Sequence, residues 1–226
     1  MLEKSSSASR RLIVTDAVFS MDGDLADLPQ LAEMARTFDA VLILDDAHGT
    51  GVLGAHGHGT LEHFGLAPSD HFINIGTLSK AIGAQGGFVA GSREVIDWII
   101  TAARPFVYST GLNPAACGAA LAAFQVLQCE PQRLSCLREV TQRLAAGLRD
   151  LGFDARLQPS PIIPVMVGDA KQAVALSEKL LARGVWCPAI RPPTVPPGTS
   201  RLRVTAAATL SDTDIERVFK AFANCR

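Results

Sequence analysis

Short apolar runs alternate with helical patterns along most of this chain, and this alternation constrains its fold more than any other feature. Val41–Leu44 is apolar at every position, as a parallel strand buried on both faces requires, and it stops abruptly at Asp45. The earlier run Leu12–Val14 is followed by apolar residues at helical spacing from Leu28 to Phe38. Strand, helix and strand in this order predict an α/β fold with a mainly parallel sheet.

The same alternation continues, and the composition then changes. Two more strands and a helix are expected at residues 72–75, 87–90 and 93–103. From residue 113 to about 151 the chain is rich in Ala, Leu, Gln and Arg, which predicts two helices broken near Pro131. In the second α/β segment, strands are expected near residues 163–167, 185–190 and 201–206. Ser211 and Asp214 have the capping-box spacing that begins a last helix.

The composition excludes several kinds of protein. Of 226 residues, 48% are hydrophobic, and 21 Lys and Arg face 22 Asp and Glu. The chain is therefore not disordered as a whole, and it lacks the basic excess that favours nucleic-acid or membrane-surface partners. No run approaches the roughly 18 apolar residues of a membrane-spanning helix, and the start MLEKSSSASRRLIV lacks a signal-peptide pattern. Five scattered cysteines without a C-x-x-C pair favour a reducing, cytoplasmic setting.

The stretch D-D-A-H-G-T-G, residues 45–51, is the first candidate site. Asp45 follows a strongly apolar strand, and open α/β sheets bind their ligands at the carboxyl ends of such strands. The acid and the imidazole of His48, followed by glycines, form a plausible site. An acidic strand end beside an ordinary loop histidine is an equally good interpretation of this segment alone.

The second candidate site, residues 77–87, also follows an apolar strand. Lys80 lies between small residues and glycines, and a confined lysine amine can act as a Schiff-base nucleophile. Thr77 and Ser79 offer hydroxyls for a phosphate, although the phosphate-loop motif G-x-x-x-x-G-K-[ST] is absent. A surface lysine beside a flexible loop stays the alternative. Together, Asp45, Lys80 and Thr77 offer the acid, amine and phosphate contact that pyridoxal phosphate needs.

With these motifs, the chain resembles the α-oxoamine synthases of the aspartate-aminotransferase fold (fold type I). These are pyridoxal-phosphate enzymes that condense an amino acid with an acyl thioester. The resemblance covers nearly the whole chain, in segments 14–24, 45–51, 77–87, 108–110 and 190–203. Family members carry a longer N-terminal portion, so we expect this chain to match their C-terminal part. The expected parts are half of the cofactor-binding large domain at 1–112, connecting helices at 113–151 and a small C-terminal α/β domain at 152–226.

The resemblance implies a role for each residue of the cofactor site. Asp45 is expected to pair with the pyridine nitrogen of pyridoxal phosphate, and His48 to hydrogen-bond its phenolic oxygen. Ser20 is expected at the same edge of the ring. Lys80 is expected to form the covalent aldimine with the cofactor and later to move the α-proton of the substrate. Thr77 is expected to bind the phosphate.

The resemblance also implies substrate contacts and a shared site. Arg203 is expected to bind the carboxylate of the amino acid, which suits a guanidinium fork. Thr194 is expected in the loop that lines the substrate entrance. Tyr108, Ser109 and Thr110 are similar to a segment that reaches the phosphate of the neighbouring subunit, which implies a homodimer.

Two loops indicate which branch of the family the chain resembles most. Asp45–Gly51 and the stretch I-R-P-P-T-V-P-P-G from Ile190 are similar to the biotin-pathway branch. This similarity implies a decarboxylating condensation of L-alanine with pimeloyl-CoA or a pimeloyl carrier protein. Two alternatives stay open: another α-oxoamine synthase, such as glycine C-acetyltransferase, and a truncated, inactive fragment that does not bind the cofactor alone.

Other residues receive more ordinary interpretations. No metal site is expected, because no H-E-x-x-H motif or cysteine partner accompanies the histidines His48, His56, His58, His63 and His71. Arg191 and Arg201 are expected to be solvated or paired with acids. Trp98 and Trp186 lie in apolar patterns and are expected in the core, as are the cysteine thiols.

Overall fold

The computed structural model describes Leu2 and residues 8–225, and these fall into two compact units. The first unit holds the chain up to Val18 together with Leu25–Pro131, and the second holds Phe19–Asp24 and the chain from Gln132. None of the helices in the described ranges combines the length and the apolar character needed to cross a membrane.

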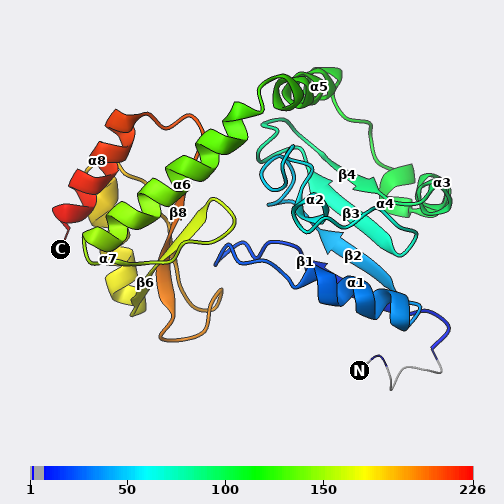
Figure 1. The fold of residues 1–226 in the computed structure, drawn as a ribbon, viewed down its shortest axis with the longest axis horizontal. Helices are drawn as coiled ribbons and strands as arrows, with labels where there is room; N and C mark the ends of the chain where they lie inside the picture. Colours follow the sequence, from blue (N-terminus) through cyan, green and yellow to red (C-terminus); the bar gives the residue numbers. More distant parts are fainter. Residues whose placement is uncertain (1, 3–7, 226) are drawn as a thin grey trace. The chain divides into compact units, whose positions relative to one another are not determined.

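The first unit contains a four-stranded sheet in the order β1-β2-β3-β4 (Figure 1). Its elements are β1 (Leu12–Asp16), α1 (Leu28–Thr37), β2 (Val41–Asp45), α2 (Thr60–His63), β3 (Phe72–Thr77), β4 (Gly87–Ala90), α3 (Arg93–Ala102), α4 (Arg104–Val107) and α5 (Pro114–Cys129). The first three strands are parallel and β4 is antiparallel, so the sheet is mainly parallel, as expected. The pairing of Asp45 with Asp16 on one side and Ile75 on the other brings the carboxyl ends of β1 and β2 level beside β3.

The core of this sheet lies between β2 and α1. Leu42 and Leu44 of β2 are fully buried, whereas Val41 and Ile43 are only partly covered. Leu28 of α1 packs into the same cluster, and the side chain of Asp27 caps that helix by accepting a hydrogen bond from the backbone N–H of Gln30. The end of β2 at Asp45 is thus held by buried residues just before it.

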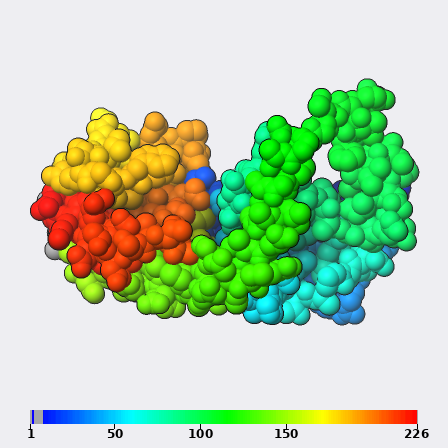
Figure 2. Space-filling model, turned by 90° about the horizontal axis from the view of Figure 1, so that it is seen from above, coloured from blue at the N-terminus to red at the C-terminus, as the bar shows by residue number. Residues whose placement is uncertain are grey.

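The second unit contains an antiparallel sheet in the order β5-β6-β8-β7, with three helices. Its elements are α6 (Gln132–Asp150), β5 (Asp154–Ala155), β6 (Ile162–Gly168), α7 (Ala170–Leu181), β7 (Ala189–Ile190), β8 (Ser200–Thr205) and α8 (Asp212–Ala223). The capping box of Ser211 and Asp214 begins α8 as expected. In the space-filling view, the red surface of α8 lies beside the yellow-green surface of α6 (Figure 2).

Three expectations about local structure were wrong in whole or in part. The strand expected at residues 185–190 is confined to Ala189–Ile190, because Pro188 has no N–H to donate to a strand ladder. Trp98 and Trp186 are 70% and 76% exposed, so neither lies in the core. The cysteine thiols were also expected in the core, but Cys117 and Cys129 are exposed, whereas Cys187 is buried.

Candidate active site

The carboxyl end of β2 presents the first candidate residues. Asp45 is exposed, and its Oδ1 accepts a hydrogen bond of 3.0 Å from the backbone N–H of Ala47. His48 lies three residues later in the turn that follows and is partly buried. A carboxylate fixed by its own turn and open to solvent at a sheet edge is able to meet a ligand.

The neighbouring Asp46 has a different role, which the sequence analysis missed. Its side chain is buried, and it accepts hydrogen bonds from both the backbone N–H, at 2.9 Å, and the hydroxyl of Thr60. Burial raises the pKa of Asp46, the Thr60 hydrogen bonds oppose this rise, and the charge of Asp45 adds to it. A Cβ at Gly49 or Gly59 would collide with this carboxylate, so these two glycines are the sequence signal that a loop closes around Asp46.

The second candidate loop begins at the end of β3. The hydroxyls of Thr77 and Ser79 lie 2.8 Å apart, and the Thr77 hydroxyl also accepts a hydrogen bond from the backbone N–H of Ser79. The backbone N–H of Leu78 donates to the carbonyl of Gly86 at 3.0 Å, which closes the loop. Two hydroxyls are thus held together at the strand end, next to the exposed Lys80.

Buried residues on either side of Lys80 anchor this loop. Leu78 and Ile82 are 9% and 5% exposed and pack with Ala120 of α5 in a small hydrophobic cluster. The backbone N–H of Gly83 donates to the carbonyl of Lys80 at 3.0 Å. The lysine therefore lies on a turn of defined shape, with its side chain exposed between two anchored positions.

Arg203 in β8 has an incompletely paired guanidinium. Its Nε is buried and has no hydrogen-bond partner among the described residues. Burial lowers the pKa of Arg203. Because buried polar groups are almost always hydrogen-bonded, this nitrogen is a position where an anionic ligand would supply the missing acceptor.

Arg201, two residues earlier in β8, is fully paired within its own unit. It is 4% exposed, forms an ion pair with Asp22 and donates from Nε to the Thr199 carbonyl at 2.9 Å. The expected acid partner is therefore Asp22, in the segment Phe19–Asp24. Gly23, beside it, has a φ of +76°, and its carbonyl accepts a hydrogen bond of 2.8 Å from the hydroxyl of Ser160.

The expected site residues are divided between the two units. Those at one sheet edge, on the ends of β2 and β3 and the loops that follow, are Asp45, His48, Thr77 and Lys80. Ser20, Thr194 and Arg203 belong to the second unit, where Ser20 is partly buried and Thr194 is exposed. Ser109 and Thr110 follow α4 and are exposed, as is Tyr108, whose ring lies 5.4 Å from the guanidinium of Arg104.

The chain matches a known protein family over nearly its whole length. A model of the aminotransferase class I and II family matches residues 1–222. The chain belongs to this family. The sheet edge described above carries an acid, an amine and two hydroxyls that lie close together, which are groups able to contact pyridoxal phosphate.

Relatives within the aminotransferase family carry more specific names. A Bacillus subtilis (strain 168) protein named 8-amino-7-oxononanoate synthase 2 is 44% identical over 98% of this chain, and a Pseudomonas putida (strain W619) 8-amino-7-oxononanoate synthase is 48% identical over 95%. The chain spans only 56% and 55% of the lengths of these two relatives. The expected resemblance to this branch of the α-oxoamine synthases is confirmed.

Solved structures confirm the expected fold. A structure of SPT with a pyridoxal phosphate internal aldimine matches with a TM-score of 0.90 and 29% identity, over 99% of this chain and 57% of the other. Sphingomonas wittichii serine palmitoyltransferase matches with a TM-score of 0.90 and 30% identity, over 99% and 57% of the two chains. The family match and these structures support pyridoxal phosphate as the cofactor and an enzyme family of fold type I.

Proposed function

We propose that this chain serves the decarboxylating condensation of L-alanine with pimeloyl-CoA, or a pimeloyl carrier protein, to 8-amino-7-oxononanoate in biotin synthesis. The observation that carries the proposal is the grouping of Asp45, Thr77 and Lys80 at one sheet edge, in a chain whose relatives bear the name of that synthase. Since the chain spans about half of those relatives, the activity is a property that must be tested on this polypeptide itself.

Each residue at the sheet edge has a proposed task. Pyridoxal phosphate, when bound, supplies an electron sink for the electrons left on the α-carbon of the amino acid. Asp45 holds the proton on the ring nitrogen, and His48 donates a hydrogen bond to the phenolic oxygen. Thr77 binds the phosphate, with its hydroxyl already directed by Ser79. Lys80 binds the aldehyde carbon through Nζ and then moves the α-proton of alanine.

Residues of the second unit are proposed to bind the substrates. Arg203 takes the alanine carboxylate, and its buried, unpartnered Nε supports this assignment. Ser20 approaches the same ring edge as His48, and Thr194 lines the entrance for the acyl thioester.

We further propose a cytoplasmic homodimer. Ser109 and Thr110 lie exposed after α4, where they are available to bind the phosphate of a neighbouring subunit. The five cysteines are free thiols in the structure, and scattered thiols persist in the reducing cytoplasm. Sedimentation of the chain with and without pyridoxal phosphate tests the dimer.

Serine palmitoyl transfer is the second candidate, because the SPT structures match with TM-scores near 0.90. Two sequence loops favour the alanine reaction, whereas these structures favour a serine substrate. Glycine, used by glycine C-acetyltransferase, is the third amino acid to compare.

A release assay for free CoA separates these substrates. The purified chain with pyridoxal phosphate is given alanine, serine or glycine, each with pimeloyl-CoA or palmitoyl-CoA. The proposal predicts CoA and carbon dioxide release from alanine with pimeloyl-CoA, loss of this release in Lys80→Ala, and no loss in the surface control Lys171→Ala. Release with serine and palmitoyl-CoA supports the second candidate, and no release with any pair contradicts activity of this chain.

A further inference from the structure

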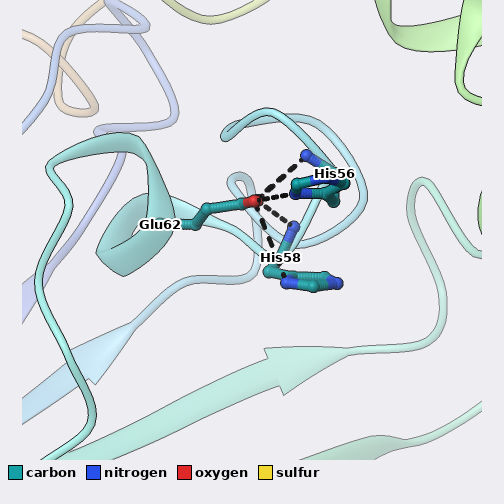
Figure 3. Close-up of side chains that lie close together, drawn as sticks. All are labelled: His56, His58 and Glu62. Atoms are coloured by element: carbon teal, nitrogen blue, oxygen red, sulfur yellow. Dashed lines mark hydrogen bonds and ion pairs between the residues drawn. The ribbon is translucent and has the colours of Figure 1, made fainter.

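Two histidines and a glutamate form a cluster outside the residues assigned to the proposed reaction (Figure 3). His56 and His58 lie in the glycine-rich loop between β2 and α2, and Glu62 lies on α2. One ligand atom from each residue can be chosen so that all of them lie within 4.8 Å of one another. The cluster has neither the H-E-x-x-H motif nor a cysteine ligand, so the sequence pattern alone did not predict it.

The geometry places both imidazoles around one carboxylate oxygen. Nδ1 of His56 lies 2.5 Å and Nδ1 of His58 lies 3.9 Å from Oε1 of Glu62. The two histidine side chains are 72% and 71% exposed, whereas that of Glu62 is 21% exposed. An ion from solvent can therefore reach the imidazole nitrogens while the carboxylate stays in place behind them.

Backbone N–H groups, as well as the His56 ring, hold Glu62 in position. Its carboxylate accepts hydrogen bonds from the backbone N–H groups of His56, at 3.2 Å, and His58, at 3.0 Å. Gly54, with a φ of +87°, passes so close to the carboxylate that a Cβ there would collide with it. The loop backbone therefore anchors the carboxylate in addition to the His56 ring, so the carboxylate keeps backbone partners when the two exposed rings turn toward an ion.

We propose that His56, His58 and Glu62 bind a zinc ion through two imidazole nitrogens and one carboxylate oxygen, with water at the fourth position. Imidazole and carboxylate are ordinary zinc ligands, at bond lengths of about 2.0–2.2 Å. A tetrahedral ion at those lengths separates its ligand atoms by roughly 3.3 Å. To bind the ion, the distance from His56 Nδ1 to Glu62 Oε1 has to increase and that from His58 Nδ1 to decrease, each by less than about 1 Å. Rotation of the two exposed side chains allows these changes.

The ion would brace the loop that surrounds Asp46. The backbone N–H of Gly51 donates to the carbonyl of Gly57 at 2.8 Å, and that of Gly59 donates to the carbonyl of Leu53 at 3.0 Å. These bonds tie the histidine loop to the end of the segment that begins at Asp45. Zinc at this position would hold the loop through its three protein ligands, and no residue of the cluster has a part in the proposed reaction.

Zinc titration of the full chain tests this site. The chain is freed of metal with a chelator, its thiols are alkylated so that exposed Cys117 and Cys129 do not bind zinc, and binding is measured by calorimetry and by the shift in Tm. The expected result is one zinc per chain with a rise in Tm for the wild type, and loss of both in His56→Ala and His58→Ala.

The matched control is His63→Ala, since His63 is exposed on α2 but lies outside the cluster. This variant is expected to bind zinc as the wild type does. The absence of saturable zinc binding by the wild type, or equal binding by a His56→Ala and His58→Ala double variant, would overturn the proposal. Because both rings are exposed, the double variant is expected to keep its fold, which circular dichroism checks.

Discussion

The two units of the molecule bury their apolar residues in different ways. The second unit has one continuous core in which three helices and a sheet share fully buried side chains, such as Leu144, Leu202 and Phe222. The first unit divides its buried residues between a cluster around Leu42 and a smaller one around Ile82. The loops that carry Asp45 and Lys80 belong to the unit with the divided core.

Exposed apolar side chains sharpen this difference. In the first unit, large ones at least 57% exposed are Leu12, Val14, Trp98, Phe106, Tyr108 and Leu121. The second unit has fewer of these, among them Trp186. The second unit is therefore stabilised by its own packing, whereas the first holds the Lys80 loop by a few local anchors. We therefore expect substitutions in the two units to differ in size and in consequence.

Phe222→Ala is expected to have the largest effect. The ring is fully buried and packs edge-to-face on Phe153, with centroids 5.1 Å apart. Its removal should lower the free energy of unfolding by about 3–5 kcal/mol, because a large cavity is left in a continuous core. Urea denaturation followed by circular dichroism measures this change. A decrease of less than about 1 kcal/mol in the free energy of unfolding would contradict a dependence of the second unit on a single core.

Ile82→Ala is expected to cost less, about 2 kcal/mol, because its cluster is small and can partly collapse. Unlike Phe222→Ala, this substitution should also change the loop that carries Lys80. Without this anchor the turn that carries Lys80 loosens, so reactivity of the Lys80 amine toward pyridoxal phosphate should fall. Leu121→Ala, at an exposed position of α5, is the control and should change neither quantity. If Leu121→Ala lowers both as much as Ile82→Ala, the anchoring role is refuted.

Ser211→Ala is expected to destabilise the second unit by about 1 kcal/mol. The Ser211 side chain accepts a hydrogen bond from the backbone N–H of Asp214, and the Asp214 carboxylate accepts one from the backbone N–H of Ser211. A shift in the urea midpoint measures the loss. Ser211→Asp, which keeps an N-cap acceptor, should recover most of it, and an equal loss in both variants would contradict the capping account.

Asp46→Asn is expected to give the smallest change, seen in the pH dependence of stability. Burial raises the pKa of Asp46 above the ordinary value of 3.8, so the folded state binds this proton more tightly than the unfolded state. The Asp46 contribution to stability therefore falls as pH rises from 3.8 through the raised pKa, and is constant above it. Asp46→Asn should lose this slope, measured as urea midpoints over that pH window, and an unchanged slope would contradict the burial of the charge.

Sequence patterns predicted the elements whose signals are local. The apolar run before Asp45 and the capping box at Ser211 were confirmed because each depends on a few neighbouring residues. The exposure of Trp98 was not predicted, since an apolar pattern does not say whether another element covers it. The hydrogen bonds from backbone N–H groups to the carboxylates of Asp46 and Glu62 were also not predicted. Both arrangements depend on a glycine backbone that lies close to the carboxylate, and the periodicity of apolar residues carries no information about such contacts.

We propose that Lys80, on its anchored turn, is the amine that binds pyridoxal phosphate. The most direct test is to incubate the purified chain with pyridoxal phosphate, reduce it with borohydride and map the modified lysines by mass spectrometry. We expect a visible absorption band and modification confined to Lys80, with the surface lysines Lys171, Lys179 and Lys220 unlabelled. No band, or labelling spread evenly over those surface lysines, would contradict it.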